Sequence, residues 1–182
     1  MAQDDPKVKM IIVLTSIMIV SAAVLTGIFV FTKPKIEAHK VQAKKEAILE
    51  VLPGSEEYKT VNKNGLELYK GYDENGNLVG TAIQTEGSGF QSVIKLMLGL
   101  DLENDKILAV KVLSHKETPG LGARMTEPWF QDQFKEKEFS DEFKAKEDVE
   151  AIAGSTISSQ SVADIIENTI EKVESATEGG GE

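Results

Sequence analysis

The sequence predicts an α+β protein, in which a single N-terminal transmembrane helix is followed by one compact domain of antiparallel hairpins with peripheral helices. Three observations support this prediction. A run of 22 residues, 10–31, carries no charge. Short alternating segments occur in pairs separated by turn residues, and an amphipathic helical pattern lies near the C-terminus. Hairpins with helices at their periphery favour an α+β domain over a parallel sheet.

The uncharged run 10–31 is the predicted transmembrane helix, preceded by a short segment, 1–9. A helix of 22 residues rises about 1.5 Å per residue and spans roughly 33 Å, enough to cross a bilayer. A cleaved signal peptide is the alternative, because Ser21-Ala22-Ala23 loosely resembles a cleavage site. Signal sequences have apolar cores of only about 7–15 residues. We therefore expect a retained, single-pass anchor in the cell membrane.

The segment 33–52 is predicted to be a juxtamembrane helix that ends before Pro53-Gly54. Five lysines lie between residues 33 and 45, whereas two precede the membrane span. Positive-inside counting would place the C-terminal side of the span in the cytoplasm. The basic segment suits anionic lipid headgroups or an anionic partner, and a solvated helix face explains it equally well.

The folded domain is expected at 55–176, with a disordered tail at 177–182. Four segments with alternating apolar residues are predicted to pair as two hairpins. They are 66–72, 78–83, 92–100 and 106–113. The first pair is joined by a turn that contains Asn75-Gly76, a strong hairpin signal, and the second by Glu103-Asn104-Asp105.

The region between the second hairpin and the C-terminal helix mixes loops with a short helix. Pro119-Gly120 and Gly122 interrupt any regular element, so 117–123 is expected to be irregular. A short helix is predicted at 125–134, with three aromatic side chains on its inner face. They are Trp129, Phe130 and Phe134. Phe139 and Phe143 continue an aromatic spacing that is typical of a core.

A glycine and four hydroxyl residues stand at the start of the C-terminal helical pattern. They are Gly154, Ser155, Thr156, Ser158 and Ser159. The apolar positions that follow have helical spacing, and they are Val162, Ile165, Ile166, Ile170 and Val173. A helix N-terminus has unpaired N–H groups and a positive dipole end, so it favours a phosphate. The alternative is that these hydroxyls only cap the helix.

Composition excludes several kinds of site. The chain has no cysteine and two histidines, so it lacks the ligands for disulfides, iron–sulfur clusters and thiolate zinc sites. Residues 46–182 contain 13 basic and 27 acidic side chains, which argues against nucleic-acid binding. His115 beside Glu117 makes no metal site alone. No complete dinucleotide fingerprint or nucleophile elbow is present, and no catalytic residue is assigned.

Two segments together resemble a known family. His115-Lys116-Glu117-Thr118-Pro119-Gly120-Leu121-Gly122 and Ala153-Gly154-Ser155-Thr156-Ile157-Ser158-Ser159 resemble the flavin-binding domain shared by the Rnf G subunit and the Nqr C subunit. The resemblance runs from about Met10 to Val173. It implies an FMN-binding domain in which FMN is joined covalently, through its phosphate, to Thr156. Ala153 stands where the family often has Ser or Asp, which leaves one hydrogen-bonding role open.

The same resemblance implies roles for the neighbouring residues. Gly154 would allow close approach of FMN, and three serines would donate hydrogen bonds nearby: Ser155, Ser158 and Ser159. The segment that shapes the flavin environment would be Glu117, Thr118, Pro119, Gly120, Leu121 and Gly122. Gly89 and Phe90 are further candidates, because glycines beside an aromatic residue can mark close approach to a flat ligand. A simple loop explains them as well.

The function implied by the resemblance is electron transfer within a membrane complex. The chain resembles most the G subunit of an Rnf complex, which moves electrons between ferredoxin and NAD while driving ion transport. The resemblance also implies partner subunits, a separate flavin transferase, and a domain on the extracytoplasmic face, against the lysine count. The alternatives are the C subunit of a sodium-translocating NADH:quinone reductase and a non-redox, membrane-anchored binding or assembly module.

Overall fold

The computed structural model describes residues 6–178, which fall into two compact units, Met1–Lys44 and Lys45–Glu182. The described part of the first unit is helical throughout and belongs to α1 (Pro6–Val51). The segment predicted as 10–31, and all but the last residue of the segment predicted as 33–52, lie in this one helix. Pro34 removes one backbone donor but does not end the helix. The second unit begins at Lys45, ten residues before the domain boundary expected from sequence.

Helix α1 contains a stretch that is long and apolar enough to cross a membrane. Its most apolar window has a mean hydropathy of 2.5, and none of that window is buried within the protein. The apolar side chains from Met10 to Phe31 are accordingly exposed. A soluble protein would not leave so many large apolar groups in water, so hydrocarbon is the environment that fits them.

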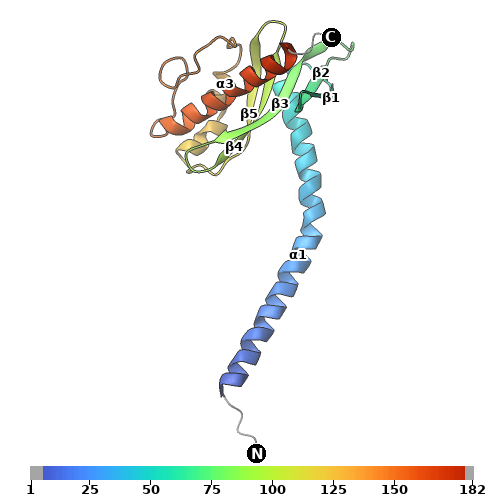
Figure 1. Ribbon diagram of the computed structural model, residues 1–182, viewed down its shortest axis with the longest axis vertical. Coiled ribbons are helices and arrows are strands. Elements are labelled where there is room, and N and C mark those ends of the chain that lie inside the picture. The colour runs from blue at the N-terminus through green and yellow to red at the C-terminus, as the bar shows by residue number, and fades with distance from the viewer. Residues whose placement is uncertain (1–5, 179–182) are drawn as a thin grey trace, which may run out of the picture. The chain divides into compact units, whose positions relative to one another are not determined.

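The second unit is built on a five-stranded antiparallel sheet in the order β1-β2-β3-β4-β5 (Figure 1). The strands are β1 (Glu57–Lys63), β2 (Leu66–Tyr72), β3 (Leu78–Ser88), β4 (Val93–Asp101) and β5 (Lys106–Ser114). The predicted α+β class and both hairpins are confirmed. Strand β1 was not predicted, because most of its side chains are exposed and its sequence lacks apolar alternation.

The sheet buries both of its faces, as adjacent residues in one strand show. Leu68 packs into one apolar cluster and Tyr69 into the other, and Ile83 and Ala82 divide in the same way. Successive side chains of a strand point to opposite faces, so the two clusters lie on opposite sides of the sheet. The smaller cluster is completed by the last residues of α1 and the residue after it: Ala47, Ile48, Val51 and Leu52.

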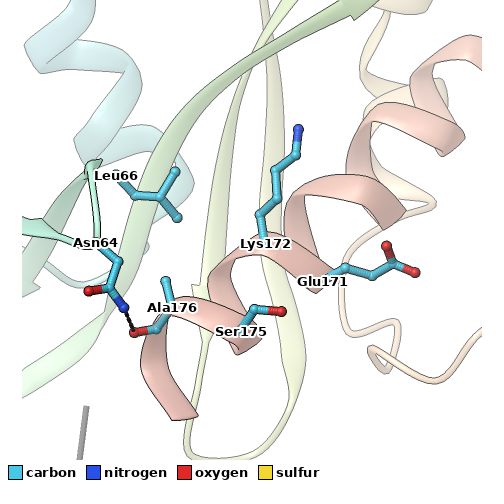
Figure 2. A pocket seen from close by; sticks show the side chains of 6 residues that line it. All are labelled: Asn64, Leu66, Glu171, Lys172, Ser175 and Ala176. Carbon is cyan, nitrogen blue, oxygen red and sulfur yellow. Dashed lines mark hydrogen bonds between the residues drawn. The ribbon is translucent and has the colours of Figure 1, made fainter. Parts of the chain in front are cut away.

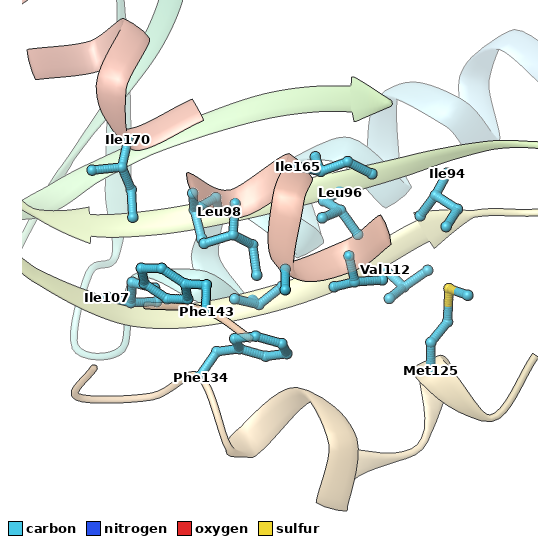
Figure 3. Packing of buried hydrophobic residues seen from close by; sticks show 14 of the residues in the cluster. Ile94, Leu96, Leu98, Ile107, Val112, Met125, Phe134, Phe143, Ile165 and Ile170 are labelled. Carbon is cyan, nitrogen blue, oxygen red and sulfur yellow. The ribbon is translucent and has the colours of Figure 1, made fainter. Parts of the chain in front are cut away.

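The larger cluster lies between the sheet and α3 (Thr156–Glu178), as Figure 3 shows. Ile165 and Ile170 of α3 lie toward Leu96 and Leu98 of β4 in this view. The five apolar positions of α3 that were predicted from helical spacing are all buried. Burial of this apolar face, rather than helix propensity alone, is what stabilises such a helix.

The connection from β5 to α3 contains a 3-10 helix, η1 (Gly122–Thr126), and a short helix, α2 (Pro128–Asp132), where one helix over 125–134 was predicted. Phe130, Phe134 and Phe143 are fully buried. Trp129 was expected on the inner face, but it is exposed. Its indole NH donates to Glu127 and its ring faces the Arg124 guanidinium. The break between η1 and α2 turns the indole outward.

The C-terminal end of α3 is held by the last residue of β1 and the turn that follows it. Asn64 Nδ2 donates to the Ala176 carbonyl at 3.1 Å, as Figure 2 shows, and Lys63 Nζ donates to the Thr177 carbonyl at 3.1 Å. These donors satisfy carbonyls that a helix end leaves without partners. Helix α3 therefore includes Thr177 and Glu178, which were expected in the tail. Residues 179–182 lie outside the described residues.

Candidate flavin site

Two loops and the first turn of α3, which are distant in sequence, meet at the carboxylate of Glu117, which is only 5% exposed. Its Oε1 accepts hydrogen bonds from the backbone amides of Gln91 at 2.9 Å and Ser92 at 3.3 Å. Its Oε2 accepts from the Ser158 hydroxyl at 2.9 Å. A buried carboxylate is costly unless donors surround it. Glu117 therefore ties the β3–β4 loop and the loop after β5 to the first turn of α3.

Three serines around the start of α3 use their hydroxyls inside the protein. Ser155 Oγ donates to Ser158 Oγ at 2.8 Å, and Ser158 donates to Glu117. Ser159 Oγ donates to the Ser155 carbonyl at 3.1 Å and accepts from the Ile152 amide at 2.9 Å. Ser158 and Ser159 are buried. The structure thus places these two predicted phosphate donors inward, against protein groups.

Thr156 differs from the three serines. It is the first residue of α3, it is half-buried, and within residues 6–178 its hydroxyl has no hydrogen-bond partner. The amides of Thr156, Ile157 and Ser158 are also unbonded in the described chain. Side-chain capping of these amides, the alternative interpretation of the hydroxyl run, is therefore not found. A free hydroxyl and three free amide donors lie together at the positive end of a helix.

Three positions around this helix end favour glycine, two because of close packing and one because of its backbone angle. A Cβ at Gly122 would lie 2.7 Å from Ser158 Oγ and 2.9 Å from Glu117 Cβ. A Cβ at Gly89 would lie 2.6 Å from Glu117 Oε1. Gly154 has a φ of +76°, the left-handed region that favours glycine. The close approach predicted for Gly89 is thus made, within the protein, to the carboxylate of Glu117.

The remaining predicted residues form an exposed turn beside the site. Thr118 Oγ1 accepts from Gln91 Nε2 at 2.9 Å, and the Thr118 carbonyl accepts from the amides of Leu121 and Ala123. Pro119 and Gly120 are exposed. Leu121 is 42% exposed, and its Cδ2 would lie 3.1 Å from a Cβ at Gly154. Ile157, in the first turn of α3, and Phe90, in the β3–β4 loop, are exposed apolar residues.

A groove with a volume of about 750 Å³ adjoins Thr156 and is lined by Gln133, Thr156 and residues 146–154. This size suits a small-molecule ligand. Sequence reasoning missed the lining residues before Ala153. They belong to an irregular loop without periodicity or motif, so no local signal could have identified them.

The groove carries three carboxylates, on Glu147, Asp148 and Glu150, and the ammonium group of Lys146. Burial opposes the charge of Asp148, but Lys137 Nζ at 3.0 Å and two backbone amides donate to it, and together they lower the pKa of Asp148 below its usual range. The groove is consequently negative. Its side chains attract a phosphate little, and the helix end supplies the attraction instead.

Comparison with known proteins first defines the class. Residues 89–171 match the family model described as the FMN-binding domain, and this range contains Gly89, Glu117 and Thr156. The chain belongs to the family of G subunits of ion-translocating oxidoreductase complexes. It is 33% identical over 181 residues to the G subunit of the ion-translocating oxidoreductase complex of Methanosarcina acetivorans, covering 94% of this chain and 96% of the relative.

One further relative agrees with this assignment, and one solved structure shares the fold. The G subunit of the proton-translocating ferredoxin:NAD(+) oxidoreductase complex of Clostridium ljungdahlii is 23% identical, with 91% of each chain covered. The crystal structure of Shewanella oneidensis NqrC has a TM-score of 0.52 and 24% identity over 66% of each chain, and it shows a shared fold. The predicted resemblance is confirmed, and with the apolar span of α1 it identifies a membrane-anchored protein.

Proposed function

We propose that this chain is the electron-relaying subunit of a membrane-bound ion-translocating ferredoxin:NAD oxidoreductase complex of the Rnf type, and that it carries FMN esterified through its phosphate to Thr156. The FMN-binding domain and the relatives named as G subunits support the complex and the cofactor. The single observation that supports the attachment residue is the free, accessible hydroxyl of Thr156 among neighbours whose hydroxyls are engaged.

The helix end fits a phosphodiester at Thr156. The unbonded amides of Thr156, Ile157 and Ser158 can donate to phosphate oxygens, and the helix dipole favours the negative charge. Because the groove itself is negative, reversible binding of FMN would gain little from side-chain charges. A covalent bond retains the cofactor without such charges, which matters on a membrane face where dilution removes free FMN.

Exposed apolar side chains near Thr156 fit a flat ring system. Ile157 is 61% exposed and directly follows the attachment residue, and Leu121 lies close to Gly154. Bound FMN supplies chemistry that accepts and donates one or two electrons, whereas the protein orients it and excludes water. We expect Leu121, Ile157 and Phe90 to contact the ring or to become covered by a neighbouring protein of the complex.

Electrons must enter and leave this chain through other subunits. The chain has no cysteine, so it has no thiolates for an iron–sulfur cluster. We propose that α1 anchors the domain beside those subunits, with the lysines of residues 33–45 near anionic headgroups or an anionic partner. A separate flavin transferase would install the FMN.

We propose further that the folded domain is extracytoplasmic. Because the chain has no natural cysteine, single cysteines can report its topology. In intact cells or spheroplasts, a membrane-impermeant maleimide should label Lys135→Cys, in the domain, and spare Lys9→Cys, before the span. The reverse pattern would show that the lysine bias, rather than the family orientation, determines the insertion.

The attachment is tested by Thr156→Val, which removes the hydroxyl and nearly preserves shape. The full-length wild type, produced with its transferase, should give a fluorescent band in a denaturing gel, and intact mass should rise by one esterified FMN. Thr156→Val should lose both signals, whereas Ser159→Ala should keep them. An unmodified wild-type chain from its own cells would instead favour the non-redox binding module. The alternative, the C subunit of an Nqr complex, shares the fold. The sequence identity to the Methanosarcina acetivorans G subunit is higher and covers more of the chain than the identity to NqrC, which favours the Rnf assignment.

A further inference from the structure

We infer that the buried carboxylate of Glu117, acting through Ser158, withholds Ser155 from the flavin transferase and so leaves Thr156 as the single acceptor. The inference rests on the proposed attachment of FMN and concerns the choice of residue. Glu117 is a positioning residue in this account, because it bonds to Ser158 and not to the reacting oxygen. The carboxylate sets the direction of a chain of hydrogen bonds.

The intrinsic chemistry of the hydroxyls does not explain a choice of Thr156. Ser155 is adjacent to it, is also half-buried, and has a primary hydroxyl that is less hindered than the secondary hydroxyl of threonine. A transferase that reaches Thr156 would therefore reach Ser155 as well, unless the fold holds the Ser155 hydroxyl elsewhere. Ser158 and Ser159 need no such explanation, because both are buried.

The fold does hold the Ser155 hydroxyl elsewhere. Ser158 Oγ donates to Glu117 Oε2 over 2.9 Å, because the carboxylate oxygen accepts this hydrogen bond. The single proton of Ser158 is then used, and Ser158 can only accept from Ser155, over 2.8 Å. Ser155 Oγ is consequently turned toward the interior. Thr156 lines the groove, and Ser155 is absent from the lining.

The transfer step needs an activated flavin, because forming a phosphodiester from FMN and a hydroxyl would require loss of water. The donor is therefore a flavin dinucleotide. The acceptor oxygen forms a bond to the phosphorus of the FMN half, the anhydride P–O bond breaks, and a nucleoside monophosphate leaves. The proton of the acceptor hydroxyl passes to a base of the transferase. A hydroxyl whose proton is held by Ser158 cannot present it to that base.

Substitution of Glu117 by Gln reverses the hydrogen-bond chain with almost no change in shape. The amide oxygen of Gln must face the amides of Gln91 and Ser92, which can only donate. Its NH₂ group then faces Ser158, which accepts from it and donates to Ser155. The proton of Ser155 becomes free to point toward the transferase. Ser158→Ala breaks the same chain by removing the acceptor.

The experiment measures modification of Ser155 in full-length chains that lack the preferred acceptor. Thr156→Val, Thr156→Val/Glu117→Gln and Thr156→Val/Ser158→Ala are each produced with the flavin transferase. Proteolysis after Lys146 and Lys172 isolates the segment that contains all four hydroxyls, and fragment ions locate the FMN. Thr156→Val/Thr169→Val is the control, since Thr169 is buried in α3 and bonds to Thr85, away from the chain of hydrogen bonds.

Thr156→Val alone and the Thr169 control should carry almost no FMN. Thr156→Val/Glu117→Gln and Thr156→Val/Ser158→Ala should carry FMN on Ser155 at a level several-fold to roughly tenfold higher, since one hydrogen bond changes an equilibrium by up to about one order of magnitude. Misfolding cannot produce this gain. Equal modification of Ser155 in all four proteins would overturn the role of Glu117. So would the absence of FMN on Ser155 in both Thr156→Val/Glu117→Gln and Thr156→Val/Ser158→Ala. A wild type unmodified at Thr156 would overturn the proposed attachment itself.

Discussion

Glu117 shows how one residue can organise a site without a part in the chemistry. Its two carboxylate oxygens accept from two segments that are separate in sequence, Gln91-Ser92 and the first turn of α3. Removal of one partner of a buried carboxylate leaves the charge uncompensated, which costs more than the net energy of the bond. The residue that carries the proposed ester, Thr156, is distinguished by the opposite property, a hydroxyl without a partner within residues 6–178.

The space beside Glu117 leads to a prediction for Gly122. Gly122→Ala would place a methyl group 2.7 Å from Ser158 Oγ and 2.9 Å from Glu117 Cβ. We expect a loss of about 1–3 kcal/mol in the free energy of unfolding, typical of overpacking. Chemical denaturation of the full chain in detergent measures this loss.

The matched control for Gly122→Ala is Gly120→Ala, in the same loop. Gly120 has a φ of +75°, and nothing lies within 4 Å of its added Cβ. It therefore tests backbone strain alone, about 1–2 kcal/mol. FMN content should fall with Gly122→Ala and stay unchanged with Gly120→Ala. Equal FMN content in both variants would contradict the steric explanation.

At the scale of elements, α3 is tied at both ends by groups from other elements. Its first turn is tied through Ser158 to Glu117, and its last carbonyls accept from Lys63, at the end of β1, and Asn64, in the turn that follows. Between these ends its apolar face packs on the sheet. This arrangement holds the helix end that carries Thr156 at a defined place, which a loop alone would not do.

Removal of the amide at Asn64 should loosen the last turn of α3. Asn64 has a φ of +50°, so Asn64→Gly deletes the side chain without adding strain. We expect a loss of about 0.5–1.5 kcal/mol and faster hydrogen exchange at Val173 to Thr177. The first turn of α3 serves as the internal reference and should exchange as in the wild type. Faster exchange along the whole helix would contradict a local clamp.

The turn between β4 and β5 should contribute a pH-dependent stability. The side-chain amide of Asn104 donates to Asp101 and lowers the pKa of this carboxyl below 3.8, against a smaller effect of burial. A lowered folded pKa means that the contribution is present above 3.8 and is lost as pH falls through the folded pKa.

Asp101→Asn removes the charge and keeps an accepting oxygen. The wild type should therefore be more stable than Asp101→Asn at neutral pH, by less than about 1 kcal/mol because the turn is exposed. The difference should vanish in acid below the folded pKa. Urea denaturation of both proteins across this range measures the difference. A difference that does not change with pH would show that charge is not its cause.

At the scale of the whole molecule, the chain divides into Met1–Lys44 and Lys45–Glu182. The division falls inside α1 rather than at its end, because Ala47, Ile48 and Val51 are buried in the smaller apolar cluster. The end of α1 thus belongs to the folded domain.

This division predicts which soluble fragments fold. Fragment 45–182 retains the residues that cover Tyr69, Ala82 and Met97, and it should be soluble and fold cooperatively. Fragment 54–182 lacks them and exposes that face of the sheet. We expect it to aggregate or to unfold several kcal/mol more easily, since each buried aliphatic side chain contributes about 1.5–3 kcal/mol. Circular dichroism and size-exclusion chromatography compare them, and equal stability would refute the assignment.

The sequence by itself determined the α+β class, the four strands with apolar alternation, the amphipathic face of α3 and the two motifs that identify the family. These features are encoded locally, in residues whose periodicity or turn chemistry is visible without neighbours. Strand β1 and the outward position of Trp129 were missed. Both depend on which surface the rest of the fold leaves free.

Only the tertiary structure decided how the site residues are used. The sequence places four hydroxyls in five residues and cannot distinguish among them. Their difference comes from Glu117, a residue 41 positions from Ser158, whose oxygen fixes which hydroxyls point inward. Hydrogen bonds across such separations depend on the packing of α3 against the sheet, because only that packing brings the two loops together.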